Sequence, residues 1–479
     1  MRHRAAAAVM ACGLVVWSER GVRAQDRGPS ALLTLRSALA EALAGGPDLQ
    51  SRADAVKAAD IRRELAASQF GLKITPQFGL ASNGAFGSSR SAGVSLAKQL
   101  STGAQTFVTV SSYALGLDGA GRDTGVTIGI SQPLLRGFSR TARAGLVDAE
   151  RAGSAAKHEW TAARAALIVH VTSQYFDVIK RQKLLAAAEQ AALRATSLTA
   201  ASQARTRVGL ATELDVLRAQ VLESRLSAAV AAAAESLIAA RDRLALAIGR
   251  GPDASLDVAP VDTTHLPASF GIVEEPLEDL VRTAAASRVE AVEARERVRD
   301  AARRASIARW NLLPPIALDV SYTRRGIGSS PATGLIVHSF LDGWHVGLNT
   351  SYSLDQSAER AAAATADLSI GAAERAARAV EQGIAAEVRR LHRAWVAAAS
   401  TIAIQQKAVD LAGRQLRLAE IRYERGLADN FDVVDAQTSV LQARSELITA
   451  ELDRIVLALD LRRAAGLLDA GALIASLVN

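Results

Sequence analysis

Residues 205–220, RTRVGLATELDVLRAQ, recur in altered form as residues 422–437, RYERGLADNFDVVDAQ. The two stretches share eight identical positions in register, among them a Gly-Leu-Ala triplet and a later Asp-Val pair. The spacing between the two glycines, 217 residues (426 − 209), also separates Gly249 from Gly466. The repeat therefore predicts a chain made of two halves built alike, with a turn at Gly209 in the first half and at Gly426 in the second.

The composition favours long helices over a thick aromatic core. Of the 479 residues only 4% are aromatic, and alanine, leucine and arginine dominate the sequence. The net charge of +7 comes from arginines scattered at helical spacing, with no basic cluster interleaved with aromatics. We therefore interpret the charge as solvated helix faces and expect no nucleic-acid partner.

The N-terminus predicts a signal peptide over residues 1–24. A basic end precedes an apolar run at residues 5–17, and residues 22–24, VRA, fit a small-residue cleavage site. The alternative is lipidation at Cys12, but the apolar run continues past it, which favours ordinary cleavage. After cleavage the chain would have neither cysteine nor methionine, so we expect no disulfide and no soft-metal site.

Helical periodicity predicts helices over most of the remaining chain, and two regions of strand alternation interrupt them. No segment has the run of 18 or more apolar residues typical of a membrane helix. The boundaries are a first helical segment at 25–72, a first β region at 73–137, a long and a returning helix at 138–249 with a turn at 208–212, an irregular connector at 250–276, a helix at 277–313, a second β hairpin at 314–356, a second long and returning helix at 357–466 with a turn at 425–429, and a tail at 467–479.

The β regions alternate apolar residues with small polar ones. In the second region Ile316, Leu318 and Val320 share one parity, while the intervening residues are small or polar. This pattern is typical of a strand with lipid on one side and water on the other. The sequence leaves open whether the first region holds two long or four short strands. A soluble sandwich strand has a similar pattern, but a sandwich needs more strands than this chain offers.

The predicted fold class is mainly α with membrane β. It consists of a duplicated helix–β-hairpin–helix unit with long antiparallel coiled-coil helices and about four strands per protomer. So few strands cannot close a membrane barrel, and an open edge in lipid leaves backbone groups unpaired. The chain must therefore oligomerise if its strands enter a membrane.

The repeated pattern, together with residues 132–137, QPLLRG, at a strand exit, resembles the TolC-type outer-membrane efflux protein family. The resemblance covers nearly all of the mature chain. It implies a homotrimer in outer-membrane lipid, with a joint barrel of about twelve strands and a helical tunnel through the periplasm. It also implies two partners, a periplasmic membrane-fusion (adaptor) protein and an inner-membrane transporter.

The resemblance further implies that the helical tips dock the adaptor. The matching positions are Val208, Gly209, Leu210 and Thr212 in the first half, and Arg425, Gly426 and Leu427 in the second. The glycines have a conformational reason as well, because a left-handed residue just past a helix end is cheap only for glycine.

The resemblance also implies a periplasmic gate at Tyr423, Asp432, Asp435 and Asp215. An N-terminal helix position explains Asp215 and Asp432 equally well, since each follows a capping residue, Thr212 or Asp429, by three positions. Asp435 lies too far along its helix for that role, so it is the stronger gate candidate. Three copies of paired carboxylates near an axis would attract cations and repel one another.

The sequence departs from the family at Ala428, where the type member has a gate arginine. Arg425 or Arg218 could replace it, and we hypothesise a coupling between Arg218 and Asp435.

The function expected is the outer-membrane channel component of a tripartite efflux or type I secretion system, which passively conducts cargo to the exterior. The alternative is a soluble periplasmic coiled-coil scaffold or adaptor without a channel, and a passive porin is less favoured because it needs no long helices. The sequence carries no enzyme signature: His158-Glu159 lacks the second histidine of a zinc-protease helix. We expect no catalytic residue, cofactor or metal site, and the cargo is not determined.

Overall fold

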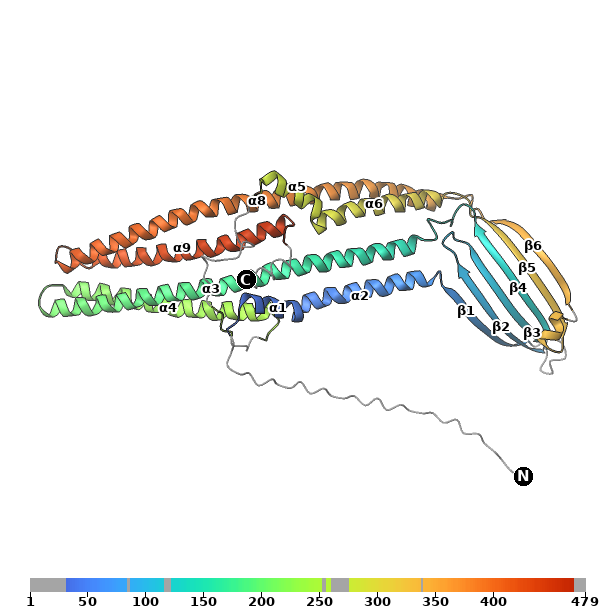
Figure 1. Cartoon of the computed structure of the whole chain (residues 1–479), viewed down its shortest axis with the longest axis horizontal. Helices are drawn as coiled ribbons and strands as arrows, with labels where there is room; N and C mark the ends of the chain where they lie inside the picture. The colour runs from blue at the N-terminus through green and yellow to red at the C-terminus, as the bar shows by residue number, and fades with distance from the viewer. Residues whose placement is uncertain are drawn as a thin grey trace, which may run out of the picture.

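The computed structural model describes residues 32–83, 87–115, 122–251, 256–259, 275–336 and 339–468. The expected signal peptide at residues 1–24 and Cys12 lie outside this part of the chain, as do most of the 250–276 connector and of the 467–479 tail. The molecule is elongated, with helices along most of its length and one sheet at one end (Figure 1).

The first half of the chain supplies four helices that run along the long axis. A Gly46-Pro47 step separates the first two, because proline fits the first position of a helix but not its interior. The helices are α1 (Leu35–Gly45), α2 (Pro47–Ser68), α3 (Ala144–Arg207) and α4 (Glu213–Ala247).

The second half repeats this arrangement beside the first. Here the break between the two shorter helices falls at Arg288, which has an extended backbone. The helices are α5 (Leu277–Ser287), α6 (Val289–Trp310), α8 (Ser357–Glu424) and α9 (Phe431–Ala464). In Figure 1 the hairpins α3–α4 and α8–α9 lie side by side and end together at the tip farthest from the sheet.

The strands form one antiparallel sheet in chain order, with β1 and β6 at its edges. The first β region supplies β1 (Leu72–Asn83), β2 (Gly87–Gln99), β3 (Gln105–Leu115) and β4 (Arg122–Pro133). The second supplies β5 (Ile316–Gly328) and β6 (Ser339–Thr350), with the short helix α7 (Pro331–Ile336) between them. In the described part of the chain the protomer therefore has six strands rather than the expected four or so. The first region folds into two consecutive hairpins, which is the option of four short strands that the sequence left open.

The two faces of the sheet differ in chemistry, and each is continuous across all strands. One row of directly paired residues is apolar: Ile74, Leu96, Val108, Ile128, Tyr322 and Trp344. The adjacent row, on the other face, is small and mostly hydroxylated: Thr75, Ser95, Thr109, Thr127, Thr323 and Gly343. Strands of 11 to 13 residues with one apolar face match the length and pattern of membrane-spanning strands.

The half of the helical region nearer the tip has an apolar core shared by both halves of the chain. Around the middle of the molecule, Ile168 and Tyr175 of α3 cluster with Leu244 of α4 and Leu459 of α9. Closer to the tip a second cluster joins α3, α4, α8 and α9, largely through alanines. Small side chains let long helices approach closely, so these four helices pack as a bundle.

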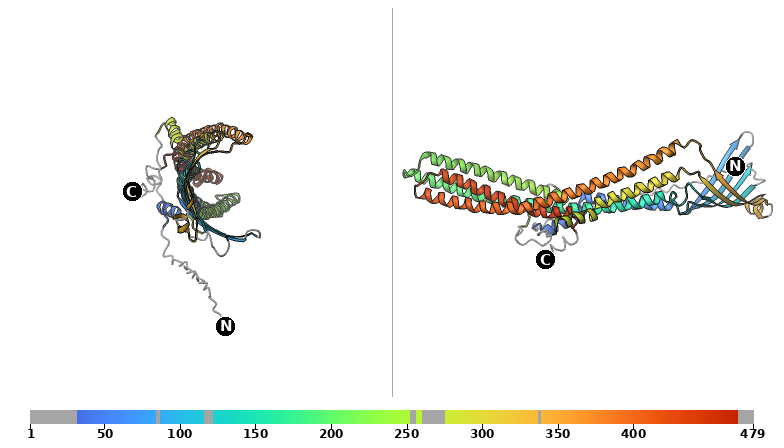
Figure 2. Two further views of the ribbon diagram at one scale, coloured as in Figure 1. Left: turned by 90° about the vertical axis from the view of Figure 1, so that its right-hand side faces the viewer. Right: turned by 90° about the horizontal axis from the view of Figure 1, so that it is seen from above.

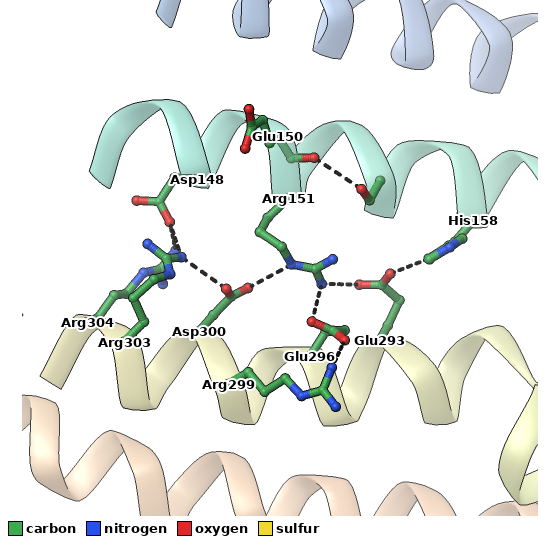
Figure 3. Close-up of polar contacts among 11 residues, drawn as sticks. Asp148, Glu150, Arg151, His158, Glu293, Glu296, Arg299, Asp300, Arg303 and Arg304 are labelled. Carbon is green, nitrogen blue, oxygen red and sulfur yellow. Dashed lines mark hydrogen bonds and ion pairs between the residues drawn. The ribbon is translucent and has the colours of Figure 1, made fainter. Parts of the chain in front are cut away.

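The half nearer the sheet joins the two repeats through charges, across what we call the polar seam. Figure 3 shows Arg151 of α3 facing three carboxylates of α6, those of Glu293, Glu296 and Asp300, at 3.5–3.8 Å. The other cross-helix contacts of the seam are His158 Nδ1 to Glu293 at 2.6 Å and Asp148 to Arg303 and Arg304 at 2.7 and 3.4 Å.

The sheet is curved, and the helices continue the same curve. The end-on view in Figure 2 shows the strands following an arc, with α1 and α5 on its outer side. Near α1, Leu33 pairs with Val258 in an isolated parallel bridge. The protomer thus resembles a section cut from the side of a hollow cylinder.

Among the described residues, no helix combines the length and the apolar character needed to cross a bilayer.

Candidate functional site

The two turns at the tip have the same geometry. Gly209 and Gly426 adopt φ values of 75° and 71°, the left-handed conformation that the sequence predicted for both. In the first turn the Leu210 amide donates to the Arg205 carbonyl at 2.9 Å, and in the second the Leu427 amide donates to the Arg422 carbonyl at 2.8 Å. These are the bonds of a Schellman motif, which pairs carbonyls that the helix end leaves free.

The turns expose apolar side chains at the very end of the molecule. Val208, Leu210 and Leu427 are 68%, 74% and 67% exposed, and Leu214 and Phe431 beside them are also exposed. Exposed apolar groups that cluster at one end of a molecule are typical of a surface that binds a partner. The residues expected to dock an adaptor therefore lie together at this tip.

Tyr423 is buried and joins the two hairpins. Its side chain is 6% exposed, and its hydroxyl lies 3.0 Å from Ser202 Oγ of α3. The Arg205 guanidinium stacks 4.5 Å from the centre of the Tyr423 ring and donates to the carbonyls of Tyr423 and Glu424, the latter at 2.6 Å. Arg205 thus adds two donors to the carbonyls at the end of α8 and holds the tyrosine by a cation–π contact.

Asp215 caps the start of its own helix. Its carboxylate accepts from the Thr212 amide at 3.0 Å and from the Thr212 hydroxyl at 2.8 Å, which forms a capping box with the reciprocal bond at 3.3 Å. Burial opposes ionisation of this carboxyl, but the Thr212 hydrogen bonds and the Arg218 charge outweigh it, so the pKa of Asp215 lies below its ordinary value. Asn430 also donates to the Asp215 carbonyl at 2.5 Å, which ties the second turn to the start of α4.

Arg218 bridges the two turns by pairing with Asp429. Its guanidinium lies 2.9 Å from the Asp429 carboxylate, 3.9 Å from Asp215 and 5.6 Å from the centre of the Phe431 ring. Within the protomer the partner of Arg218 is thus Asp429 rather than Asp435. Asp429 also accepts from the Phe431 amide at 3.1 Å, although the residue at the cap position of α9 is Asn430.

Asp432 and Asp435 point to no cation of their own protomer. Asp435 is exposed and Asp432 half-buried. Neither has an ion-pair partner among the residues that the structure describes. Asp432 lies in the first turn of α9, where the helix dipole stabilises its charge. Asp435 is one turn farther along and has no such role.

The sequence reasoning missed Arg205, Ser202 and Asn430, the side chains that join the two turns to each other. The available signal was the repeat itself, since Arg205 and Arg422 are its first identical position. The partner of each residue depends on how the hairpins pack, which spacing along the chain does not give.

A comparison with protein-family models matches residues 38–250 and 280–467 to the outer membrane efflux protein family. These segments include both repeats, both β regions and both tips. The chain belongs to the outer membrane efflux protein family. Members of this family are outer-membrane channels rather than enzymes, and the chain is accordingly an outer-membrane protein with a periplasmic helical extension.

Solved structures with the same fold span nearly the whole chain. The outer-membrane channel OprN shares 20% identity at a TM-score of 0.68, over 90% of this chain and 89% of that one. VceC from Vibrio cholerae shares 19% identity at a TM-score of 0.69, over 90% of this chain and 96% of VceC. The open-state MtrE channel from Neisseria gonorrhoeae shares 18% identity at a TM-score of 0.68, over 90% of this chain and 89% of MtrE. A comparison with curated proteins found no match.

In this efflux-family chain, the described residues contain no group of three or more histidines, cysteines and acids that could hold a metal ion. His158, which the sequence singled out beside Glu159, pairs instead with Glu293 in the polar seam.

Proposed function

We propose that this chain is the outer-membrane component of a tripartite efflux or type I secretion system. In this role it passively conducts cargo from a periplasmic adaptor and inner-membrane transporter to the exterior. One observation carries the proposal: a curved sheet, apolar on one face and hydroxylated on the other, stands on helices far longer than a bilayer is thick. Such a sheet suits lipid outside and water inside.

The free sheet edges support closure by identical copies, and the family to which the chain belongs supports three of them. The unpaired backbone groups of β1 and β6 would each cost several kcal/mol in lipid. A sheet with an even number of antiparallel strands has oppositely directed edges, so β6 of one copy can pair antiparallel with β1 of the next. Copies joined in this way close a barrel, and Figure 2 shows that the sheet of one protomer is already curved.

The exposed apolar tip supports a role in adaptor docking. Val208, Leu210 and Leu427 lie at the end farthest from the sheet, where a periplasmic partner has access to them. The two Schellman turns fix their backbone, so a partner would meet a preformed surface. The flanking positions Gly209, Thr212, Arg425 and Gly426 belong to this proposed surface.

The same tip would form the gate. Arg205 and Tyr423 hold the two hairpins together within a protomer, and Arg218 with Asp429 adds an ion pair between the turns. Asp435 is exposed and has no ion-pair partner among the described residues, and so is available for contacts between copies. Opening would require the hairpins to separate at the Ser202–Tyr423 contact, and repulsion between Asp435 carboxylates would favour it.

Fractionation and reconstitution test the proposal. The full-length chain, expressed in a Gram-negative host that lacks its own efflux channel, should fractionate with outer-membrane vesicles. It should restore drug export only when a matching periplasmic adaptor and inner-membrane transporter are co-expressed, with the chain alone as the control. A chain found in the soluble periplasm, with no export under either condition, would support the scaffold alternative instead.

A further inference from the structure

We infer that the membrane barrel of this channel has eighteen strands, six from each of three copies, and that it is therefore about as wide as the helical tunnel beneath it. The inference rests on the proposed function, because it takes the homotrimer as given. What it adds is the place of the β2–β3 hairpin: in the barrel and in contact with lipid, rather than folded into the lumen or outside it.

The side-chain pattern of the hairpin is the first argument. Leu96 of β2 and Val108 of β3 continue the apolar row of the sheet, while Ser95 and Thr109 continue the hydroxyl row. A hairpin immersed in water on both faces has no need of an apolar row in register with its neighbours. The match on both faces indicates that β2 and β3 meet lipid and water as β4 and β5 do.

The hydrogen-bonded order of the strands is the second argument. The strands β2 and β3 lie between β1 and β4, with every residue of β1 paired to β2 and none to β4. If the hairpin left the sheet, β1 would lose its partner along the whole of Leu72–Asn83 and β4 would lose its partner along residues 122–131. Backbone groups unpaired within a bilayer are prohibitively costly, so the hairpin could leave only if β1 and β4 paired with each other, and the observed strand order has no such pairing.

The width of the helical layer is the third argument. At the sheet end each protomer presents four helices, α2, α3, α6 and α8, which contact one another in that order. Helices packed about 8–10 Å apart make four of them about 32–40 Å wide. Strands spaced about 4.8 Å apart and tilted by about 40° make six of them about 38 Å wide, but four only about 25 Å. Six strands therefore match the helices that carry them.

The consequence is a barrel without a constriction. The same spacing gives an eighteen-stranded barrel a backbone diameter of about 36 Å, whereas twelve strands give about 24 Å. A tunnel that keeps its width to the outer surface admits bulkier cargo than one that narrows in the membrane. We therefore expect selection by size to occur at the tip rather than at the exit.

Electron cryomicroscopy of the full chain in lipid nanodiscs tests the inference directly. We expect a trimer with eighteen strands and β2–β3 in the barrel. A trimer with twelve strands and the hairpin elsewhere would overturn this inference and leave the proposed function standing. A monomer that does not enter lipid would overturn both.

A deletion variant provides the matched comparison. Removing residues 87–115 takes out β2 and β3 and leaves β1 and β4 able to pair directly, with Ile74 opposite Ile128. The variant should form a trimer whose barrel diameter is smaller by about one third. A variant barrel as wide as the wild type would contradict the inference.

Single-site labelling decides the matter should the deletion variant not fold. Nitroxide labels at Leu96→Cys and Val108→Cys should be accessible to oxygen in lipid, as a label at Ile128→Cys in β4 is expected to be. Labels at Ser95→Cys and Thr109→Cys should be accessible to a water-soluble nickel reagent, like the reference label at Thr127→Cys. Water accessibility at Leu96 and Val108 would place the hairpin outside the lipid-facing surface and overturn the inference.

Discussion

The two repeats of this protein are joined by different chemistry at the two ends of the helical region. From the middle of the molecule toward the tip, α3 packs against α9 and its neighbours, first through buried residues such as Ile168, Tyr175 and Leu459 and then through the alanine-rich second cluster. Near the sheet, α3 meets α6 through Arg151, its three carboxylates and the other charged pairs of the polar seam (Figure 3). One end therefore has a core within a single chain, and the other relies on ion pairs.

The difference shows which part of the protomer can be stable alone. Apolar burial contributes roughly 25 cal/mol per Å² and is not subject to electrostatic screening, whereas partly exposed ion pairs contribute little and are screened by salt. The helices α2 and α6 bury few large apolar residues in the protomer. We expect the sheet end to gain its stability from neighbouring copies and the tip end to hold its bundle unaided.

The largest effect is expected in the apolar core. Leu244→Ala removes a side chain that is fully buried among α1, α3 and α4, and should lower the free energy of unfolding by about 2–5 kcal/mol. Leu246→Ala, two residues away and 60% exposed, is the matched control. Thermal unfolding in detergent measures both, and equal losses for the two variants would contradict a core at this position.

The next effect is expected at the tip. Arg205→Ala removes two hydrogen bonds to carbonyls at the end of α8 and the stacking on Tyr423, which together are worth about 2–3 kcal/mol. The hairpins should loosen, and cells should admit a large hydrophilic antibiotic that the wild type excludes. Arg207→Ala changes an exposed arginine two residues farther along α3 and should not change uptake. An Arg205 variant that excludes the antibiotic as well as the wild type does would show that this contact is not part of the gate.

A smaller effect is expected in the polar seam. Arg151→Gln removes the cation shared by Glu293, Glu296 and Asp300, at a cost of about 1 kcal/mol because solvent reaches the seam. Hydrogen exchange should rise in α6 and in the first turns of α3, and wild-type protein in high salt should behave in the same way. Arg299→Gln breaks a pair with Glu296 within α6 only and should leave hydrogen exchange in α3 unchanged. If high salt does not change hydrogen exchange in α3 and α6 of the wild type, ion pairs do not hold this end together.

The smallest effect concerns Asp215 and pH. Because its pKa is lowered in the folded state, its charge stabilises the fold fully above the ordinary value of 3.8, and this stabilisation is lost as pH falls through the lowered pKa. Asp215→Asn should cost roughly 0.5 kcal/mol at neutral pH and should flatten the acid limb of a stability profile measured below about pH 4. A variant with an unchanged acid limb would show that this carboxyl does not titrate with unfolding.

Local rules made the fold class predictable, and long-range contacts set the limits of the prediction. The turns at Gly209 and Gly426 could be predicted from the sequence because each depends only on the backbone conformation of its own glycine. The number of strands did not follow, because residues 93–110 alternate weakly and their pairing with β1 and β4 depends on the whole sheet. Likewise Arg218 was matched with Asp435, whereas the packing of the hairpins brings it to Asp429.

Cross-linking between the two sheet edges tests the central claim most directly, namely that identical copies complete one another's sheet. Starting from a Cys12→Ser background, which leaves no other cysteine, Ile74→Cys in β1 is combined in turn with a cysteine at Trp344, Val346 or Leu348 in β6. Mild oxidation in intact outer membranes should give, for at least one pair, a covalent ladder that ends at three subunits. Ladders that run beyond three subunits, or chains that stay monomeric for every pair, would contradict the account.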